Sequence, residues 1–253
     1  MPLAEIAAFE DTKERLIVAM DVDSANAAHG LVAELGDVVS SFKIGLQLFT
    51  SAGPAFVREL SEAGHRIFLD LKFHDIPNTV ANAGVEAAKL GVWMFDVHAL
   101  GGSEMMRRTA DSVNEFCSRD GTSRPKIIAV TILTSSDANV LREVGIERDV
   151  ESEVVYLARL TAKCGLDGVV ASSIEANAIK NAVDRPFLVV TPGIRPASET
   201  SDDQKRVNTP ADAINAGADY LVVGRPITEA ADRRAAAIAI ANEISFSSRK
   251  IPE

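Results

Sequence analysis

The 253-residue sequence is poor in cysteine, in aromatic residues and in long apolar runs. Its two cysteines, Cys117 and Cys164, are not spaced for a metal site, and so few thiols are typical of a protein kept reduced in the cytoplasm. No stretch reaches the roughly 18 apolar residues of a membrane span. The first residues also lack the basic-then-apolar pattern of a secretion signal. We therefore expect a cytoplasmic protein with free thiols and no membrane association.

Basic runs are absent as well. The formal net charge is −10, from 26 Lys and Arg against 36 Asp and Glu. Proteins that bind nucleic acid carry clustered positive charge to meet the phosphate backbone, so neither DNA nor RNA is an expected partner. A small anion is not excluded, because a few local arginines and backbone N–H groups can bind one in an acidic protein.

What the sequence does have is a regular alternation of short apolar runs with Ala-rich amphipathic segments. Strands that are apolar on both faces and are followed by helices are typical of a parallel sheet covered by helices. Eight such units predict an α/β fold of the (β/α)8 barrel type, with residues 1–253 as one domain because no linker or change in composition divides them. The expected strands are Leu16–Met20, Ser41–Ile44, Ile67–Leu71, Trp93–Val97, Ile127–Ile132, Gly168–Ala171, Phe187–Thr191 and Tyr220–Val223.

Glycine follows several of the expected helices. Gly36, Gly64, Gly91, Gly165 and Gly217 each precede a strand by a few residues, which predicts a left-handed helix C-cap at each. A doubly wound open sheet is the alternative fold, but the first strand is not followed by the G-x-G-x-x-G of a dinucleotide site. The expected helices are Ala25–Leu35, Pro54–Ala63, Thr79–Leu90, Ser103–Arg119, Glu153–Cys164, Ser173–Val183, Pro210–Ala216 and Thr228–Ile244.

Polar or glycine residues follow the carboxyl ends of all eight expected strands. In a (β/α)8 barrel these ends meet on one face, and that face carries the active site. A purely structural barrel would not need them, so we expect a functional site there. The residues are Asp21, Lys43, Asp70, Lys72, Asp75, His98, Thr131, Thr134, Ser172, Pro192, Arg195, Gly224 and Arg225.

Charge is concentrated in DLKFHDIPNT, which follows the third strand's apolar residues. Residues two apart on a strand point to the same side, so Asp70 and Lys72 share a face, while Asp75 falls in the turn that follows. Charges at such a position are costly to bury unless they are paired or functional. From these residues alone, a structural ion pair and a catalytic pair are equally open.

Two loops on the same face suit a phosphate group. In VVGRPI, Gly224 lets the backbone approach an anion, Arg225 supplies forked donors, and the next proline can open a helix. Barrels of this type often bind phosphate after strands seven and eight. PGIRP adds Arg195 at the start of the irregular segment Pro192–Asn208, which has the length of an active-site lid. The structural alternative at Arg225 is a tight turn with a solvent-facing arginine.

Together these motifs resemble the orotidine 5′-phosphate decarboxylase family, whose reaction completes pyrimidine nucleotide synthesis. The most specific family motif, D-x-K-x-x-D-I-P-N-T, stands complete at 70–79. Six further motifs stand in the family's order along nearly the whole chain. They are AMDVD at 19–23, FKIG at 42–45, TILTS at 131–135, TPGIRP at 191–196, DQKR at 203–206 and VVGRPI at 222–227.

The resemblance implies a homodimeric barrel that converts orotidine 5′-phosphate to uridine 5′-phosphate without a metal or a cofactor. It implies a catalytic array of alternating charge, formed by Lys43, Asp70, Lys72 and Asp75 of the partner subunit. Lys72 would donate a proton to C6 of the pyrimidine. The active site would lie at the subunit interface, so that each chain completes its partner's array.

The resemblance also implies how the substrate is held. Ile76 and Thr79 would reach into the partner's site, where Thr79 helps Asp21 and Lys43 to hold the ribose. Thr134 would touch the pyrimidine, with Thr131 as the alternative. The remaining substrate-binding residues would be Pro192, Arg195, Gln204, Gly224 and Arg225, of which the last four bind the phosphate and Gln204 also reaches toward the base.

Two other functions are compatible with parts of this pattern. A Mg²⁺-dependent sugar-phosphate decarboxylase or synthase of the same superfamily would share the Asp-x-Lys-x-x-Asp spacing. Lys43 speaks against it, because a cation there takes the space and charge that a metal would need. A barrel that only binds nucleotide, as a sensor or scaffold, is the third alternative, and an intact charged array disfavours it.

Overall fold

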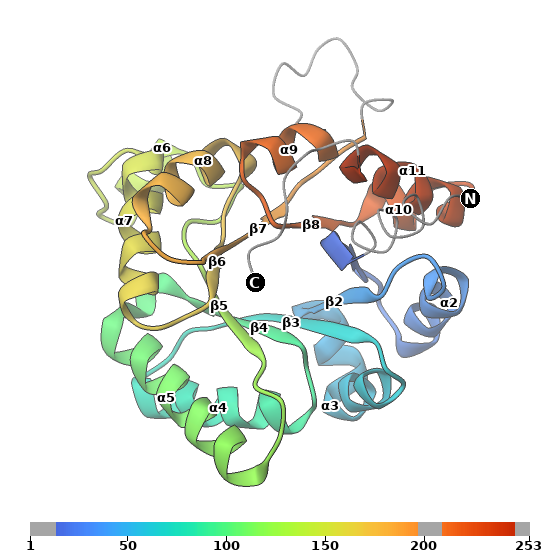
Figure 1. Ribbon diagram of the computed structural model, residues 1–253, viewed down its shortest axis with the longest axis horizontal. Helices are drawn as coiled ribbons and strands as arrows, with labels where there is room; N and C mark the ends of the chain where they lie inside the picture. Colours follow the sequence, from blue (N-terminus) through green and yellow to red (C-terminus); the bar gives the residue numbers. More distant parts are fainter. Residues whose placement is uncertain (1–13, 197–208, 246–253) are drawn as a thin grey trace.

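The computed structural model describes residues 14–196 and 209–245, and its eight parallel strands form a closed barrel (Figure 1). The first strand pairs with both the second and the eighth, which closes the sheet and excludes the open alternative. All eight predicted strands are confirmed to within two residues at each end. They are β1 (Leu16–Ala19), β2 (Ser41–Gly45), β3 (Arg66–Phe73), β4 (Met94–His98), β5 (Lys126–Val130), β6 (Gly168–Val170), β7 (Leu188–Pro192) and β8 (Tyr220–Val223).

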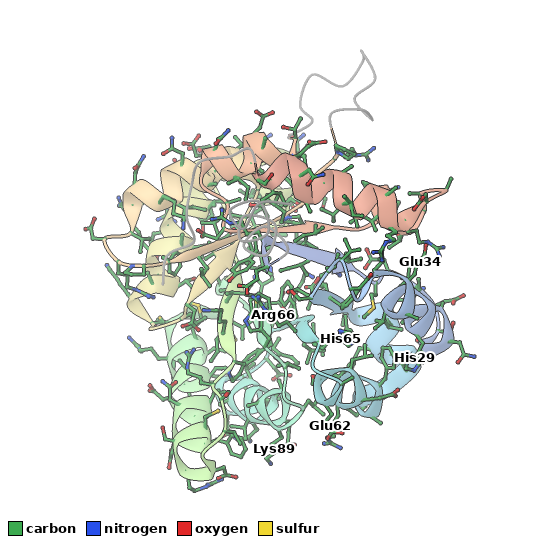
Figure 2. The ribbon with its side chains drawn as sticks, turned by 45° about the vertical axis from the view of Figure 1, so that its right-hand side comes forward. His29, Glu34, Glu62, His65, Arg66 and Lys89 are labelled. Atoms are coloured by element: carbon green, nitrogen blue, oxygen red, sulfur yellow. The ribbon has the colours of Figure 1, made fainter. Side chains whose placement is uncertain are left out.

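Helices surround the barrel and put their polar sides outward, as Glu34, Glu62 and Lys89 do in Figure 2. No helix in the described part of the chain is long and apolar enough to cross a membrane. The helices are α2 (Ala25–Leu35), α3 (Leu46–Glu62), α4 (Pro77–Lys89), α5 (Gly102–Asp120), α6 (Ala138–Glu143), α7 (Val150–Lys163), α8 (Ser173–Ala182), α9 (Pro210–Ala216), α10 (Arg225–Thr228) and α11 (Arg233–Ser245), with a 3₁₀ turn, η1, at Ala99–Gly101.

Two predictions about the helices are wrong, and one helix was not predicted. The single helix expected over Thr228–Ile244 is two helices, because the Asp232 side chain accepts a hydrogen bond from the Ala235 N–H and so starts α11 afresh. Helix α6 was missed; the Asp137 side chain caps it. Gly36 is right-handed, with a φ of −64°, because it continues the helical turn and its N–H donates to the Val32 carbonyl oxygen. The other four predicted glycines do have positive φ.

Two apolar layers hold the barrel together. Side chains alternate along each strand, so one set packs against the helices and the other fills the barrel. At the amino end, the Arg66 guanidinium carbon lies 3.9 Å from the centroid of the Trp93 ring, which in turn meets Tyr220 edge-on. The amino end is thus filled, and polar side chains gather at the carboxyl end. The inner set comprises Ile17, Ala19, Phe68, Met94, Ile128, Leu188, Val190, Tyr220 and Val222.

The two cysteines lie among the helices and in the core, away from the open end of the barrel. Cys117 and Cys164 are both buried free thiols, as predicted. Burial raises the pKa of the Cys164 thiol. Both side chains therefore act as small apolar core groups.

Candidate active site

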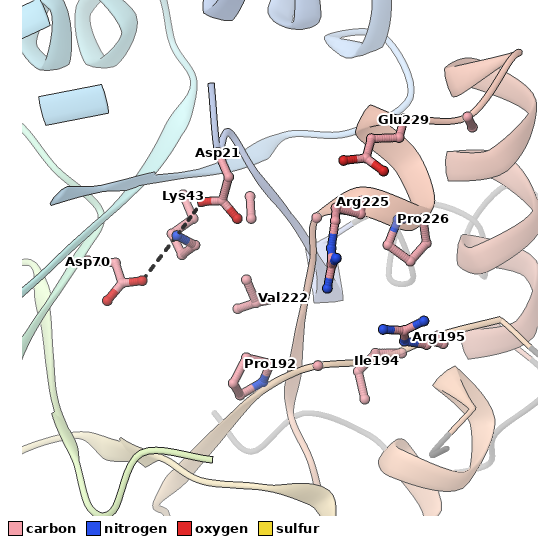
Figure 3. Close-up of a pocket in the computed structure, with 14 residues that line it drawn as sticks. Asp21, Lys43, Asp70, Pro192, Ile194, Arg195, Val222, Arg225, Pro226 and Glu229 are labelled. Atoms are coloured by element: carbon pink, nitrogen blue, oxygen red, sulfur yellow. Dashed lines mark hydrogen bonds and ion pairs between the residues drawn. The ribbon is translucent and has the colours of Figure 1, made fainter. Parts of the chain in front are cut away.

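A cavity of about 590 Å³ opens at the carboxyl ends of β1, β2, β3, β7 and β8 (Figure 3). Asp21, Lys43 and Asp70 line one side, and Arg195 and Arg225 line the other. A second cavity of about 180 Å³ adjoins it, since both are lined by Lys43 and Asp70. Nine of the predicted strand-end residues thus line one continuous space, namely Asp21, Lys43, Asp70, Lys72, Thr134, Pro192, Arg195, Gly224 and Arg225.

Asp70 is the centre of a chain of ion pairs. The Lys43 Nζ lies 3.1 Å from Asp70 Oδ2 and 3.2 Å from Asp21 Oδ1, and the Lys72 Nζ pairs with Asp70 Oδ1. The Lys43 and Asp70 side chains are only 11% and 14% exposed. Little solvent screens their attraction, so each charge depends on its neighbours.

The surroundings favour the charged forms of Lys43 and Asp70. Burial alone would lower the pKa of Lys43, but attraction to Asp70 and Asp21 outweighs burial and raises it. Burial alone would raise the pKa of Asp70, but Lys43 and Lys72 together bring it below its usual value. The result is a fixed alternation of negative and positive charge along the cavity wall.

Lys72 has an unusual backbone conformation. Its φ of 52° makes it the only non-glycine residue with a positive φ in the described ranges. The pairing of β3 with β4 changes register between Leu69 and Phe73, and the Lys72 N–H donates to Asp96 Oδ1 at 2.8 Å. Residues held in sparsely populated conformations cluster at functional sites. The predicted meeting of Lys72 with Asp70 is confirmed, but an irregular strand end produces it.

Sequence reasoning missed two acidic residues of the site. Asp96 lies under the array, and the only signal for it was an acid within the apolar strand MFDVH. Glu229, just after α10, lines the larger cavity beside Arg225 and had no motif to mark it. Asp96 on β4 and Glu229 after α10 come close to the site only when the barrel folds, so their positions in the sequence did not mark them.

Asp75 lies apart from the array within its own chain. Its Oδ1 accepts a hydrogen bond from the Ile76 N–H at 2.6 Å, and the Ile76 side chain projects outward, 67% exposed. Asp75 and Thr79 line a separate surface cavity of about 290 Å³, which Lys72 also borders. A single chain therefore does not bring Asp75, Ile76 and Thr79 into the cavity that holds Asp70.

The structure distinguishes the two candidate threonines. Thr134 lines the smaller cavity together with Lys72 and the apolar side chains of β5, β6 and β8. Thr131 is fully buried, and its hydroxyl donates to the Val170 carbonyl oxygen at 3.0 Å. Only Thr134 can meet a ligand in that cavity.

The candidate phosphate loops face the array from across the larger cavity. Pro192, Arg195, Gly224 and Arg225 all line it, and Figure 3 shows both guanidinium groups on the side opposite Asp70. Gly224 also lies close to β1, since a side chain there would meet Asp21 Oδ2 at 3.4 Å. Most of the irregular segment Pro192–Asn208, including the predicted Gln204, lies outside the described residues.

Two other strand-end residues have structural partners. Ser172 caps α8 together with Glu175, whose Oε2 accepts from the Ser172 N–H at 2.9 Å. His98 stacks on His74 at 5.4 Å, and its Nδ1 accepts from the Leu100 N–H. Burial, with a smaller effect of His74, lowers the pKa of His98 to about 4, so it is neutral at pH 7. Within residues 14–196 and 209–245, no three His, Cys, Asp or Glu side chains gather as a metal site would require.

The whole barrel matches a known family. Residues 14–240 match the sequence model of the Orotidine 5'-phosphate decarboxylase / HUMPS family. The chain belongs to this family. An orotidine 5'-phosphate decarboxylase of Geobacter sulfurreducens is 52% identical over 236 residues, which are 93% of this chain and 98% of that protein. One of Moorella thermoacetica is 53% identical over 235 residues, 92% of this chain and 93% of the relative.

Solved structures of the family have the same barrel. A crystal structure of orotidine 5'-phosphate decarboxylase from Lactobacillus acidophilus superposes with a TM-score of 0.81 at 40% identity, over 91% of this chain and 99% of that one. The family assignment drawn from the seven motifs is therefore confirmed, and so is the (β/α)8 barrel.

Proposed function

We propose that this chain is a single catalytic domain that decarboxylates orotidine 5′-phosphate to uridine 5′-phosphate, a carbon–carbon lyase reaction. The observation that supports this most directly is the chain of ion pairs from Asp21 through Lys43 and Asp70 to Lys72, in one cavity with two arginines. The array provides a proton donor within the electrostatic field of fixed, paired charges. The arginines provide a binding site for the phosphate of the substrate.

The cavity offers a separate place for each part of the nucleotide. The phosphate binds at Arg195 and Arg225, with the Gly224 backbone close to it and, from the segment outside the described residues, Gln204. The ribose lies against Asp21 and Lys43; the Asp21 side chain is 60% exposed and can accept from a sugar hydroxyl. The pyrimidine enters the smaller, mostly apolar cavity beside Thr134.

Lys72 performs the proton transfer. The bond from C6 to the carboxylate breaks, CO2 leaves, and the electron pair stays at C6 in an orbital that the ring cannot delocalise. The Lys72 ammonium stabilises this charge and then gives C6 a proton, which solvent later restores to Nζ. Two unit charges about 4 Å apart at an effective dielectric near 20 interact by roughly 4 kcal/mol, which is less than the 8–23 kcal/mol that enzymes remove from barriers. Binding energy at the phosphate and ribose supplies the rest.

Asp70 sets the geometry of that transfer. The Lys43 and Lys72 charges favour its ionised form, and its ion pair with Lys72 directs the ammonium group toward the smaller cavity. It also places a negative charge beside the carboxylate that leaves. The repulsion is relieved as CO2 departs, which adds to the driving force for bond cleavage.

A chelator-treated assay tests the function. After dialysis against a chelator, the protein is expected to convert orotidine 5′-phosphate, followed by its absorbance, at the full rate and without stimulation by Mg²⁺. The reason is that the Lys43 ammonium already occupies the position between two carboxylates where a cation would bind. Loss of activity that Mg²⁺ restores would instead support a metal-dependent sugar-phosphate enzyme of this family. Calorimetric binding without turnover would support a nucleotide-binding sensor.

We further propose a homodimer in which Asp75, Ile76 and Thr79 complete the neighbouring subunit's site. The support is that these residues are exposed and lie outside the array of their own chain, while the Ile76 side chain projects into solvent. A C2 dimer would place the same loop of each chain over the other chain's cavity.

Subunit mixing tests the shared site. Lys72→Ala and Asp75→Ala are each expected to be nearly inactive alone, because each removes one member of every array. After the two variants exchange subunits at equal concentration, about a quarter of wild-type activity should return, since half of the dimers are mixed and each has one intact site. Activity that stays absent after verified exchange, or a fully active monomer, would contradict the shared site.

A further inference from the structure

Asp96 lies inside the barrel directly below the array. It is two residues beyond Met94 on β4, so both side chains point inward, and Met94 belongs to the apolar filling of the barrel. Asp96 is fully buried, with 0% of its surface exposed. A carboxyl group in that position must be satisfied by neighbours rather than by bulk water.

The two oxygens of Asp96 have different surroundings. Oδ1 accepts the Lys72 N–H at 2.8 Å, whereas Oδ2 has no hydrogen-bond donor in the described part of the chain. The charged groups that act on Asp96 are Asp70 and Lys72 of β3, and the pKa shifts of Asp70 and Asp96 each include an effect of the other carboxyl group. Lys43 of β2 lies beyond Asp70, on its other oxygen. A hydrogen bond between the two carboxyl groups requires a proton on one of them, because two ionised carboxylates are both acceptors.

The electrostatics assign that proton to Asp96. Burial raises the pKa of Asp96 well above its usual value, and the negative charge of Asp70 raises it further against the opposing effect of Lys72. The pKa of Asp70 shifts the other way, because it has a lysine on each of its oxygens. A neutral Asp96 can donate from Oδ2 to Asp70, which satisfies the oxygen that otherwise has no partner.

We propose that Asp96 is a positioning residue for the decarboxylation, acting as a neutral carboxylic acid that holds the Lys72 backbone with Oδ1 and donates from Oδ2 to Asp70. From the interior of the barrel, Asp96 thus contacts both members of the ion pair, Asp70 and Lys72, and keeps Lys72 in its left-handed conformation. When Asp96 ionises as the pH rises, the hydrogen bond is lost and a second negative charge faces Asp70. The Lys72 ammonium then interacts with two carboxylates, and catalysis declines. This inference rests on the proposed function.

Two substitutions separate this role from simple packing. Asparagine in Asp96→Asn keeps an acceptor for the Lys72 N–H and a donor for Asp70 but cannot ionise, so kcat at pH 7 should stay within about threefold of wild type. Asp96→Ala removes both hydrogen bonds and should lower kcat by about 10- to 100-fold with little change in KM. The alkaline limb of the kcat/KM profile should move to higher pH in Asp96→Asn, because the ionisation that ends catalysis in the wild type is gone.

Two results would overturn the proposal. One is an alkaline limb in Asp96→Asn that coincides with that of the wild type. The other is a loss of kcat in Asp96→Asn as large as in Asp96→Ala, since a charge rather than a neutral donor would then be needed. If Asp96→Ala does not fold, as thermal melting would show, Asp96→Asn carries the test alone.

Infrared spectroscopy tests the protonation state of Asp96 independently of the proposed function. The wild-type protein at pH 7 should show the carbonyl stretch of a buried protonated carboxyl group, and Asp96→Asn should lack it. This readout needs no turnover, so it applies even if the protein fails to decarboxylate orotidine 5′-phosphate. Absence of that band from the wild type would refute the neutral state of Asp96.

Discussion

Replacement of Lys72 by alanine is expected to lower kcat/KM for orotidine 5′-phosphate by about 10⁴-fold or more, through the loss of both a proton donor and a stabilising charge. Lys43 and Lys72 both border the smaller cavity, but Lys43 is shared between Asp21 and Asp70 and also lines the larger cavity, so the proton transfer is assigned to Lys72. Asp70 would keep its pair with Lys43, so the rest of the site should hold its shape. Uridine 5′-phosphate should therefore still bind, as calorimetry would measure.

Lys89→Ala is the matched control for this substitution. Lys89 is an exposed lysine on α4 whose Nζ pairs with Glu86, and it contacts neither cavity. A surface ion pair contributes at most about 1 kcal/mol, so activity and melting temperature should change little. Turnover of Lys72→Ala within tenfold of wild type would refute the assigned role of Lys72.

Loss of both cavity arginines, in Arg195→Ala/Arg225→Ala, is expected to lower kcat/KM by roughly 10²–10⁴-fold, since each charge-assisted hydrogen bond contributes about 1.5–3 kcal/mol. Both side chains line the cavity on the side opposite Asp70, where the phosphate is proposed to bind. Because remote binding energy also supports the chemical step, kcat should fall together with the increase in KM.

The non-phosphorylated nucleoside orotidine makes this test specific. Wild type and the double variant should decarboxylate orotidine at the same low rate, because the arginines have no phosphate to bind. Arg119→Ala, at an exposed arginine of α5 that pairs with Asp120, is the matched control and should resemble wild type with both substrates. A double variant that loses as much activity toward orotidine as toward the nucleotide would show that the arginines serve the structure instead.

Much of the site was predictable because a parallel barrel imposes a simple rule. Once eight strand–helix units are recognised, the carboxyl end of each strand must face the same opening. That rule alone was enough to bring Asp21, Lys43 and Asp70 to the cavity with Arg195 and Arg225. The family motif then ranked these residues above others at strand ends, such as Ser172, which caps a helix.

The wrong or missing predictions depend on single side-chain contacts or on the tertiary fold, which the hydrophobic pattern and the motifs do not contain. The break before α11 depends on one capping side chain, Asp232, inside an otherwise helical stretch. Thr131 and Thr134 both follow β5. The hydrogen bond from the Thr131 hydroxyl to the Val170 carbonyl oxygen, which only the folded barrel creates, shows that Thr131 is not the residue that contacts the substrate. Glu229 directly follows α10 and lines the cavity, although no motif in the sequence marks it.

By itself the sequence determined the barrel, the face that carries the chemistry and the family. The alternation of apolar segments, the residues that follow each strand and the order of the motifs can all be read along the chain. Only the tertiary structure decided how the DLKFHDIPNT segment is used. The pairing of β3 with β4 is irregular there, so that Lys72 has a positive φ and lies between Asp70 and the buried Asp96. That arrangement joins residues of neighbouring strands in the barrel's interior, where burial and neighbouring charges act on the pKa of each group. The spacing of residues along one strand does not contain that information.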